Sequence, residues 1–300
     1  MFNLDFIILF YSFILNFLII KVLFVKSKFL DYFFLYSKEN NNLVPVYPGV
    51  SLVLSFSILA FFYHSQFIIY NDFMVILFST IIVFILGFID DMININTFSK
   101  ILFQIILSSY IIFILEFDKI SLLPFLNNYL LNYIALIFFI LGIFNCINLI
   151  DGIDNLSAYL SIIISSFFIL ISFLLLYKNM NFIFFIIIGS MLSYLFYNNF
   201  ISRVFLGDSG SLVLGWIFSI TSLLFIKKTD NISVHIPLLI LAVPAFDVIY
   251  VMISRYIKNK SQDFFVQIKN IFKGDYNHIH HSLKDLKFDN KNICLILSIL

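Results

Sequence analysis

Long apolar segments separated by short polar ones dominate the chain. A membrane-spanning helix needs about 20 mostly apolar residues. Nine segments meet this requirement, near residues 6–25, 49–69, 72–89, 99–117, 129–147, 156–177, 181–199, 210–226 and 234–254. A further apolar segment at 293–300 is expected to be a short C-terminal stub. The pattern predicts an all-α, polytopic membrane helix bundle of nine full spans that forms one domain over residues 1–300.

The composition supports the membrane class. Hydrophobic residues make up 62% of the chain and charged residues 12%, with a mean hydropathy of +1.04. Soluble domains carry about 25% charged residues. The first apolar segment exceeds a signal-peptide core and lacks a small-residue cleavage site, so we expect it to be retained. The two cysteines show no metal-ligand spacing, and the net charge of +1 gives no indication of a nucleic-acid partner.

The basic residues are distributed unequally between the two sides of the predicted bundle. If all nine segments cross the membrane, consecutive loops alternate between its two faces. One face then carries fourteen of the eighteen Lys and Arg residues. Cytoplasmic loops are enriched in these residues. The asymmetry therefore predicts that this face is cytoplasmic and that the N-terminus lies outside.

Acidic and histidine residues gather in four loops on the same face. These are the loop near 87–100 with Asp90 and Asp91, that near 145–155 with Asp151 and Asp154, that near 203–211 with Asp208, and that at 255–291 with His278, His280 and His281. Carboxylates placed so close together repel one another unless a cation joins them. Mg²⁺ favours oxygen ligands from one or two carboxylates together with substrate phosphates. The pattern predicts a metal–phosphate site at the membrane surface, with Mg²⁺ or Mn²⁺ as the cofactor.

Neighbouring residues supply other groups that such a site requires. Lys100 and the histidines could bind phosphate oxygens. Asn145 and Asn148 could form hydrogen bonds with a nucleotide base or sugar. Gly152 permits a tight turn and close approach of the backbone.

Simpler interpretations stay open for each motif taken alone. Asp90 and Asp91 could end a helix at the interface. Asp154, and less readily Asp151, could cap the following helix. Asp208 could belong to an ordinary turn. None of these interpretations explains why all the motifs share one face.

The order of the motifs resembles that of a known family. The sequence contains "GFIDD", then Lys100 and Gln104, then "NCINLIDGID", "FLGDSGS", "PAFD" and "HIHH". This series resembles the polyprenyl-phosphate N-acetylhexosamine-1-phosphate transferases, the membrane glycosyltransferase family 4. The segment "NHIHH" is closer to the branch that uses N-acetylglucosamine and initiates O-antigen or teichoic acid. The muramoyl-pentapeptide branch usually has three consecutive histidines.

The resemblance implies an activity and a location. A family member would transfer a sugar-1-phosphate from a UDP-sugar to polyprenyl (undecaprenyl) phosphate and release UMP. The enzyme would lie in the bacterial cytoplasmic membrane and initiate a cell-surface polysaccharide such as that of lipopolysaccharide. A homodimer is compatible with the sequence but is not indicated by it.

The resemblance also implies roles for individual residues. Asp208 would be the first metal ligand, and Asp91 would support the metal or Lys100. Asp90 would orient or deprotonate the lipid phosphate. The nucleoside and diphosphate would be bound by the remaining predicted residues, namely Asp151, Gly152, Asp154, Phe205, which could stack on uracil, and Lys100, His280 and His281, which would meet the diphosphate.

Two positions depart from the family pattern, and other protein classes stay possible. Tyr276 stands where this branch usually has Arg, and Asn155 where the family usually has Gly. An ion-coupled transporter would instead place acids near mid-span and show a repeat. An aromatic prenyltransferase would space its acids along helices. A scaffold derived from the transferase fold would lack activity.

Overall fold

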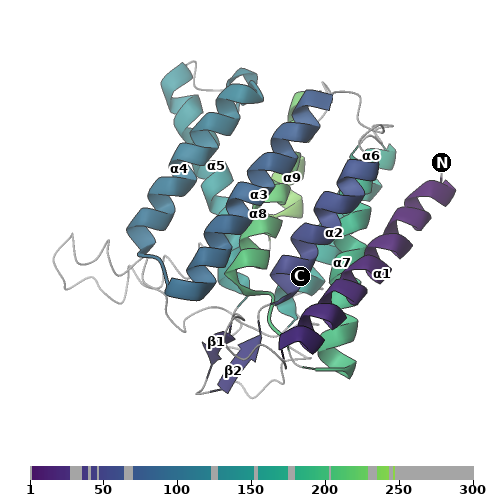
Figure 1. The fold of residues 1–300 in the computed structure, drawn as a ribbon. Helices are drawn as coiled ribbons and strands as arrows, with labels where there is room; N and C mark the ends of the chain where they lie inside the picture. Colours follow the sequence, from purple (N-terminus) through teal and green to yellow (C-terminus); the bar gives the residue numbers. More distant parts are fainter. Residues whose placement is uncertain are drawn as a thin grey trace.

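The computed structural model describes most of the chain up to residue 246. The described residues are 2–27, 36–39, 42–45, 47–63, 70–122, 128–151, 155–174, 180–202, 204–228, 235–242 and 246. Within them, seven helices are long and apolar enough to cross a membrane. They are α1 (Phe2–Ser27), α3 (Tyr70–Ile93), α4 (Thr97–Ile114), α5 (Tyr129–Ile150), α6 (Leu156–Leu174), α7 (Asn181–Phe200) and α8 (Gly207–Lys228). The protein is thus a multi-pass membrane helix bundle, as predicted (Figure 1).

Two of the nine predicted spans, at 49–69 and 234–254, are described only in part, since residues 64–69 and 243–245 lie outside the described residues. The apolar part of α2 (Tyr47–Tyr63) covers only Pro48–Phe62. The span predicted at 234–254 begins as α9 (His235–Ile240). Its remainder from 247 onward lies outside the described residues, as does the predicted stub at 293–300.

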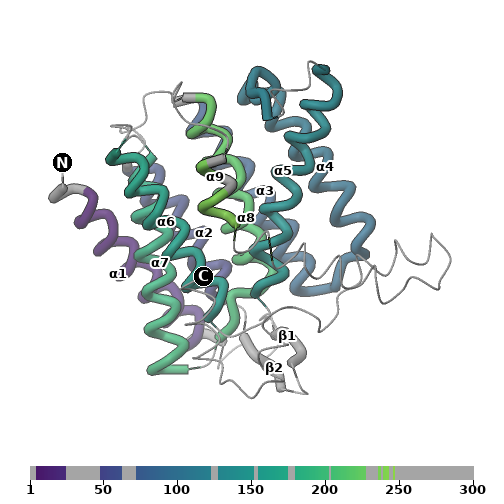
Figure 2. The backbone as a smooth tube through the Cα atoms, turned by 180° about the vertical axis from the view of Figure 1, so that it is seen from behind, coloured from purple at the N-terminus to yellow at the C-terminus, as the bar shows by residue number. Residues whose placement is uncertain are grey.

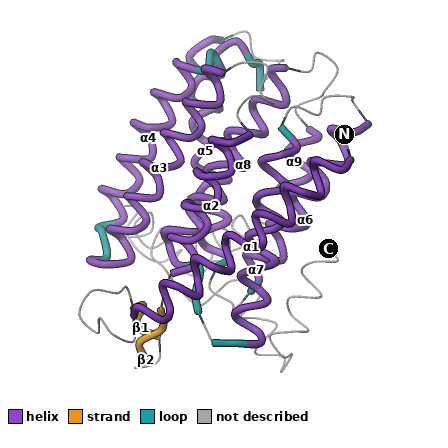
Figure 3. The backbone as a smooth tube through the Cα atoms, turned by 45° about the vertical axis from the view of Figure 1, so that its right-hand side comes forward, coloured by secondary structure: helices purple, strands orange, loops and turns teal. Residues whose placement is uncertain are grey.

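A small β-hairpin, which the sequence did not predict, accompanies the helices. Strands β1 (Tyr36–Glu39) and β2 (Asn42–Pro45) pair antiparallel, with Tyr36 opposite Pro45. The hairpin lies at the lower end of the bundle in Figure 1 and is orange in Figure 3. Four residues per strand are too few to give a clear alternating pattern. A short 3-10 helix, η2 (Phe117–Lys119), follows α4 in the connection to α5.

Helix α8 forms the centre of the bundle. In the most apolar part of this helix 94% of the residues are buried, against 22% for α1 and 28% for α4. It packs against α2, α3 and α5, and α7 packs against α1, α2 and α6 (Figure 2). Small residues allow this close packing, since a Cβ added to Gly215 would lie 2.6 Å from the carbonyl oxygen of Phe144. The position of α8 is therefore fixed from several sides.

Several helices extend beyond the apolar segments that predicted them. Helix α3 continues through Asp90 and Asp91, and α8 begins at Gly207, just before Asp208. Asp151 ends α5, whereas the sequence placed it at the start of the next helix, which begins only at Leu156. Helix ends therefore carry Asp90, Asp91, Asp151 and Asp208, and a helix end holds a side chain more firmly than a loop does.

Candidate active site

Lys100 joins two acidic residues that are far apart in the sequence. Its ammonium nitrogen donates to Asp90 Oδ2 at 2.6 Å and to Asp208 Oδ2 at 2.7 Å. The side chains of Lys100 and Asp90 are 14% and 9% exposed, and that of Asp208 is 37% exposed. The end of α3, the first turn of α4 and the first turn of α8 thus meet at one cluster of charges, open to ligands on the side of Asp208.

Asp90 also shapes the turn that places Lys100. Its Oδ1 accepts the backbone N–H of Ile95 at 2.7 Å. Asn94 has a positive φ of 50°, a conformation that asparagine tolerates better than most residues. Asn96 then caps α4 by accepting the N–H of Phe98 at 3.2 Å. The carboxylate of Asp90 therefore connects the backbone of the turn with the charge of Lys100.

Asp91 faces a different neighbour from Asp90. Consecutive residues of a helix project about 100° apart, and Asp91 points at the beginning of α8. Its Oδ1 accepts the backbone N–H of Asp208 at 2.8 Å, and its Oδ2 accepts that of Ser209 at 2.9 Å. The first N–H groups of a helix lack partners and carry partial positive charge. Asp91 therefore caps α8 from another helix and holds the backbone of Asp208.

Glycines let the backbones of α2 and α3 approach the first turn of α8. Gly87 lies one turn before Asp91, and a Cβ there would be 2.6 Å from the carbonyl oxygen of Asp208. A Cβ on Gly49 would be 2.7 Å from the nitrogen of Gly210. Gly207 has a φ of 73°, which suits glycine. The turn that carries Asp208 is enclosed by backbone on two sides.

The amides of α5 complete this cluster. Asn148 Nδ2 donates to Asp208 Oδ1 and to Ser211 Oγ, both at 2.9 Å. Asn145 and Gln104 exchange two hydrogen bonds at 2.9 and 3.2 Å, and Gln104 is 1% exposed. The sequence predicted a role for both asparagines in binding a base or sugar. The structure shows Asn148 fixing the carboxylate of Asp208 and Asn145 joining α5 to α4.

The remaining predicted residues are placed only in part. Asp151 accepts a short hydrogen bond from Ser157 Oγ across the turn into α6. Phe205 is partly exposed in the segment that leads to Asp208. The other predicted residues lie outside the described part of the chain, namely Gly152, Asp154, Tyr276, His278, His280 and His281.

The donor groups fit a divalent cation that also binds substrate. Within the described part of the chain, no three His, Cys, Asp or Glu side chains form a metal cage by themselves. Asp90 and Asp208 nevertheless converge on one cation, the ammonium of Lys100. Two carboxylates completed by phosphate oxygens and water suit Mg²⁺. Both oxygens of Asp91 accept backbone N–H groups of α8, whereas Asp90 Oδ2 accepts from the ammonium of Lys100, a side-chain cation that it shares with Asp208. Asp90 is therefore the better partner for Asp208.

Helical spacing could have identified some partners that the sequence patterns left without a role. Gln104 lies four residues after Lys100, and Gly87 four residues before Asp91, so each shares a helix face with a site residue. Ser211 stands three residues after Asp208 in the same way. No local pattern indicated the contribution of Ser157, which depends on how α6 follows α5.

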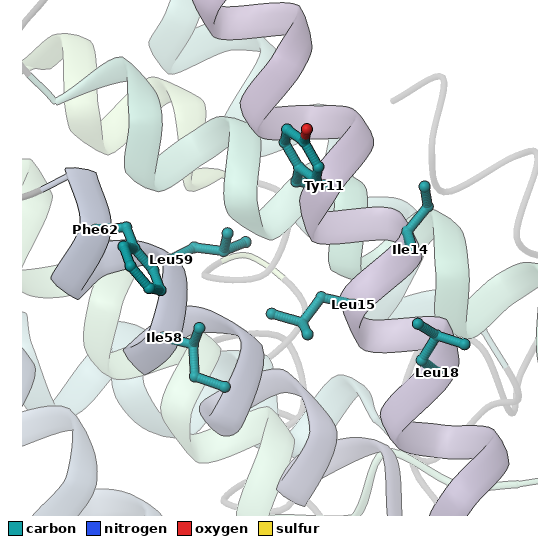
Figure 4. Close-up of a pocket in the computed structure, with 7 residues that line it drawn as sticks. All are labelled: Tyr11, Ile14, Leu15, Leu18, Ile58, Leu59 and Phe62. Atoms are coloured by element: carbon teal, nitrogen blue, oxygen red, sulfur yellow. The ribbon is translucent and has the colours of Figure 1, made fainter.

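An apolar groove elsewhere in the bundle is separate from this cluster. It has a volume of about 530 Å³ and lies between α1 and α2 (Figure 4). The residues that line it are Tyr11, Ile14, Leu15, Leu18, Ile58, Leu59 and Phe62. The lining carries no acid, base or amide side chain, so the groove supplies none of the chemistry of the charged cluster.

Comparison with known proteins gives a consistent result. The sequence model of glycosyl transferase family 4 matches residues 73–226. A Bacillus subtilis (strain 168) protein named "Probable undecaprenyl-phosphate N-acetylglucosaminyl 1-phosphate transferase" is 34% identical over 72% of this chain and 59% of its own length. Phospho-N-acetylmuramoyl-pentapeptide-transferases of Clostridium perfringens (strain 13 / Type A) and Staphylococcus haemolyticus (strain JCSC1435) are each 27% identical. The alignments cover 77% and 78% of this chain and 73% and 74% of those proteins.

Proposed function

Because the chain belongs to glycosyl transferase family 4, we propose that it transfers a sugar-1-phosphate from a UDP-sugar to polyprenyl phosphate and releases UMP. The membership confirms the resemblance that the motifs indicated. The chain spans 59% of the length of its Bacillus relative, so the activity is proposed on the site that the chain itself contains. The observation that carries the proposal is the convergence of Asp90, Lys100 and Asp208 at the start of α8.

The preferred donor is UDP-N-acetylglucosamine or a similar UDP-N-acetylhexosamine. The relative named for N-acetylglucosaminyl transfer is 34% identical, against 27% for the two named for muramoyl-pentapeptide transfer. The "NHIHH" segment favours the same branch. Muramoyl-pentapeptide-1-phosphate transfer is the alternative.

In the reaction, the lipid phosphate replaces UMP as the group joined to the β-phosphate through a phosphoanhydride bond. An oxygen of the lipid phosphate attacks the β-phosphorus of the donor and forms a new P–O bond. The bond between the β-phosphorus and the bridging oxygen breaks, and its electron pair leaves with the α-phosphate of UMP. A phosphate monoester is mostly ionised at neutral pH, since its second pKa is about 6. The acceptor therefore needs orientation and charge neutralisation more than it needs a base.

Lys100 and Asp90 supply that orientation on our proposal. The ammonium of Lys100 lies between two carboxylates in the free protein, within reach of any phosphate that approaches Asp208. Phosphoryl transfer depends chiefly on positioning and on stabilising charge on the transferred oxygens. Asp90 keeps Lys100 in place through its hydrogen bonds and helps to orient the lipid phosphate.

Asp208 is proposed as the principal metal ligand, with Asp90 beside it. A bound Mg²⁺ would neutralise the charge of the diphosphate. Asn148 fixes one oxygen of Asp208, and Asp91 fixes its backbone, so the carboxylate is held in place before any ligand binds. Asp91 acts on this proposal by holding α8 rather than by binding the metal.

The site is proposed to face the cytoplasm of a bacterium. The asymmetry of Lys and Arg supports this orientation, with the N-terminus outside. The prenyl chain of the acceptor would remain among the apolar helices while its phosphate reaches the charged cluster. A transporter would place its acids at mid-span, whereas those described here meet at helix ends.

A UMP-release assay tests the proposal. Purified protein in lipid nanodiscs is incubated with Mg²⁺, undecaprenyl phosphate and each of a panel of UDP-sugars. We expect UMP and lipid-linked sugar with UDP-N-acetylglucosamine or a related sugar, loss of activity with EDTA, and recovery with added Mg²⁺. Absence of UMP with every sugar, while a known family enzyme is active in parallel, would contradict the proposal.

A further inference from the structure

Asn155 adopts a backbone conformation that explains its departure from the family pattern. Its φ is 71°, in the left-handed region. Glycine enters this region without strain, and asparagine is among the few other residues that do so readily. The change from the usual Gly to Asn therefore keeps the turn and adds a side chain at its end.

That side chain connects the turn to the last turn of α7. Asn198 Nδ2 donates to Asn155 Oδ1 at 2.7 Å. Asn155 Nδ2 in turn donates to Asn199 Oδ1 at 3.0 Å, on the exposed side. Helices α6 and α7 pack against each other, so these contacts extend an existing interface (Figure 2). A glycine at 155 could form neither hydrogen bond.

Asn198 carries the connection onward to the segment before α8. Its Oδ1 accepts the backbone N–H of Val204 at 2.9 Å. The carbonyl oxygen of Val204 accepts from the hydroxyl of Tyr194 at 3.3 Å. Val204 and Leu206 are fully buried. The segment that leads to Asp208 is thus held by α7 through both the backbone N–H and the carbonyl oxygen of Val204.

The two connected segments carry the predicted nucleotide-binding residues. Asp151 ends α5, and Asn155 directly precedes α6, where the carbonyl oxygen of Asn155 accepts the N–H of Tyr159 at 3.0 Å. Phe205 follows Val204 directly. A change in the spacing between the turn and the segment would alter the distance between Asp151 and Phe205.

We propose that Asn155 and Asn198 form an amide bracket that sets this spacing and thereby determines how tightly the nucleotide part of the donor is held. The inference rests on the proposed function and adds two positioning residues to it. Neither residue needs to contact the substrate. The bracket is neutral, so it affects the affinity for the donor without changing the charge around the reacting phosphates.

Kinetics of the full chain in nanodiscs test the bracket. Asn155→Gly keeps the left-handed backbone and removes both amide links. We expect the KM for the UDP-sugar to rise about five- to tenfold, as for a loss of about 1 kcal/mol of hydrogen bonding. The kcat and the KM for undecaprenyl phosphate should stay within about twofold of wild type. Asn198→Ala should have at least the same effect, and the double variant should raise the donor KM by less than the product of the two single effects, because both variants remove the same Asn155–Asn198 hydrogen bond.

Ser166→Ala is the matched control. Ser166 is an exposed residue of α6 whose hydroxyl bonds only to the carbonyl oxygen of Ile162 in its own helix. Its removal should leave all three kinetic parameters unchanged. An unchanged donor KM in Asn155→Gly, or an equal change in kcat and both KM values, would overturn the bracket.

Amide hydrogen exchange gives a second readout that needs no turnover. In Asn155→Gly, peptides covering 155–159 and 204–206 should exchange severalfold faster, while peptides from α3 should not change. If wild type shows this coupling but releases no UMP with any UDP-sugar, the proposed function fails and the role of the bracket in donor binding fails with it. If wild type is active and neither exchange nor donor KM changes in the variant, only the bracket is overturned.

Discussion

The two sides of the site are held together by different forces. Around Asp208, charged groups from α3, α4 and α8 meet through hydrogen bonds of 2.6–2.9 Å, and glycines let the backbones touch. Around the turn that ends at Asn155, neutral amides make the links. Charge-assisted hydrogen bonds are about twice as strong as neutral ones. We therefore expect the proposed phosphate side to tolerate little change, and the proposed nucleotide side to accept substitutions that change the affinity for the donor.

Replacing Asp208 should have the largest effect on the phosphate side. Asp208→Asn removes the charge while leaving the backbone capped by Asp91. We expect a fall in kcat of about 10²–10³-fold or more, as when a group that stabilises transition-state charge is lost. UMP release and thermal unfolding in nanodiscs measure activity and stability, and the melting temperature should change little. Asp118→Asn, which changes a partly exposed acid in η2, serves as the control and should remain active.

Replacing Asp91 should reduce both activity and stability. Asp91→Ala leaves the N–H groups of Asp208 and Ser209 without their partner, at a cost of about 1–3 kcal/mol each. We expect kcat to fall about a hundredfold and the melting temperature to fall with it, which separates this variant from Asp208→Asn. A variant that loses activity and Mg²⁺ affinity with wild-type stability would show that Asp91 is a metal ligand.

A methyl group at Gly87 should displace the first turn of α8. Its Cβ would meet the carbonyl oxygen of Asp208 at 2.6 Å, and backbone cannot move aside as easily as a side chain. Gly87→Ala should lower kcat about tenfold, because small misplacements of reacting groups carry large kinetic costs. Gly142→Ala is the matched control, since no atom of the described residues lies within 4 Å of its Cβ position. Equal activity of the two variants would show that the close contact at Gly87 is not needed for activity.

The smallest effect is expected from the amide pair that joins α4 to α5. Gln104→Leu removes two hydrogen bonds to Asn145, which keeps its bond to the carbonyl oxygen of Leu141 at 2.8 Å. We expect a two- to fivefold fall in kcat with an unchanged donor KM, consistent with about 1 kcal/mol for neutral hydrogen bonds. Steady-state kinetics against the UDP-sugar check this. A rise in donor KM alone would place Asn145 on the nucleotide side, contrary to this assignment.

Much of the site could be predicted from the sequence because its residues stand next to long apolar segments. The helices that carry Asp90, Asp91, Asn148 and Asp208 were all predicted from hydrophobic length. The pair Asp90–Asp91 was predicted as one acidic unit. In the structure the two acids have different partners: Asp90 binds Lys100, and Asp91 binds the backbone of α8. Which acid faces which partner depends on the rotation of α3 in the bundle, and residue type alone does not reveal that rotation.

Features set by tertiary contacts could not be predicted. The β1–β2 hairpin is too short to produce a pattern, and the first turn of α8 is polar, so hydrophobicity placed its start three residues late, at residue 210. Asn198 lies in an ordinary polar helix end. Its importance follows only from its contacts with Val204, six residues later, and with Asn155, which is 43 residues earlier and comes close when α6 packs on α7.

A donor labelled with ³²P at the β-phosphate tests the central claim most directly. Wild-type protein in nanodiscs is incubated with labelled UDP-N-acetylglucosamine, Mg²⁺ and undecaprenyl phosphate, and the organic and aqueous phases are separated. We predict that the label moves into the lipid, with one unlabelled UMP released for each labelled lipid formed. Label recovered as UDP, or retained in water as free sugar phosphate, would show that a different bond is broken or a different acceptor is used, and would contradict the account.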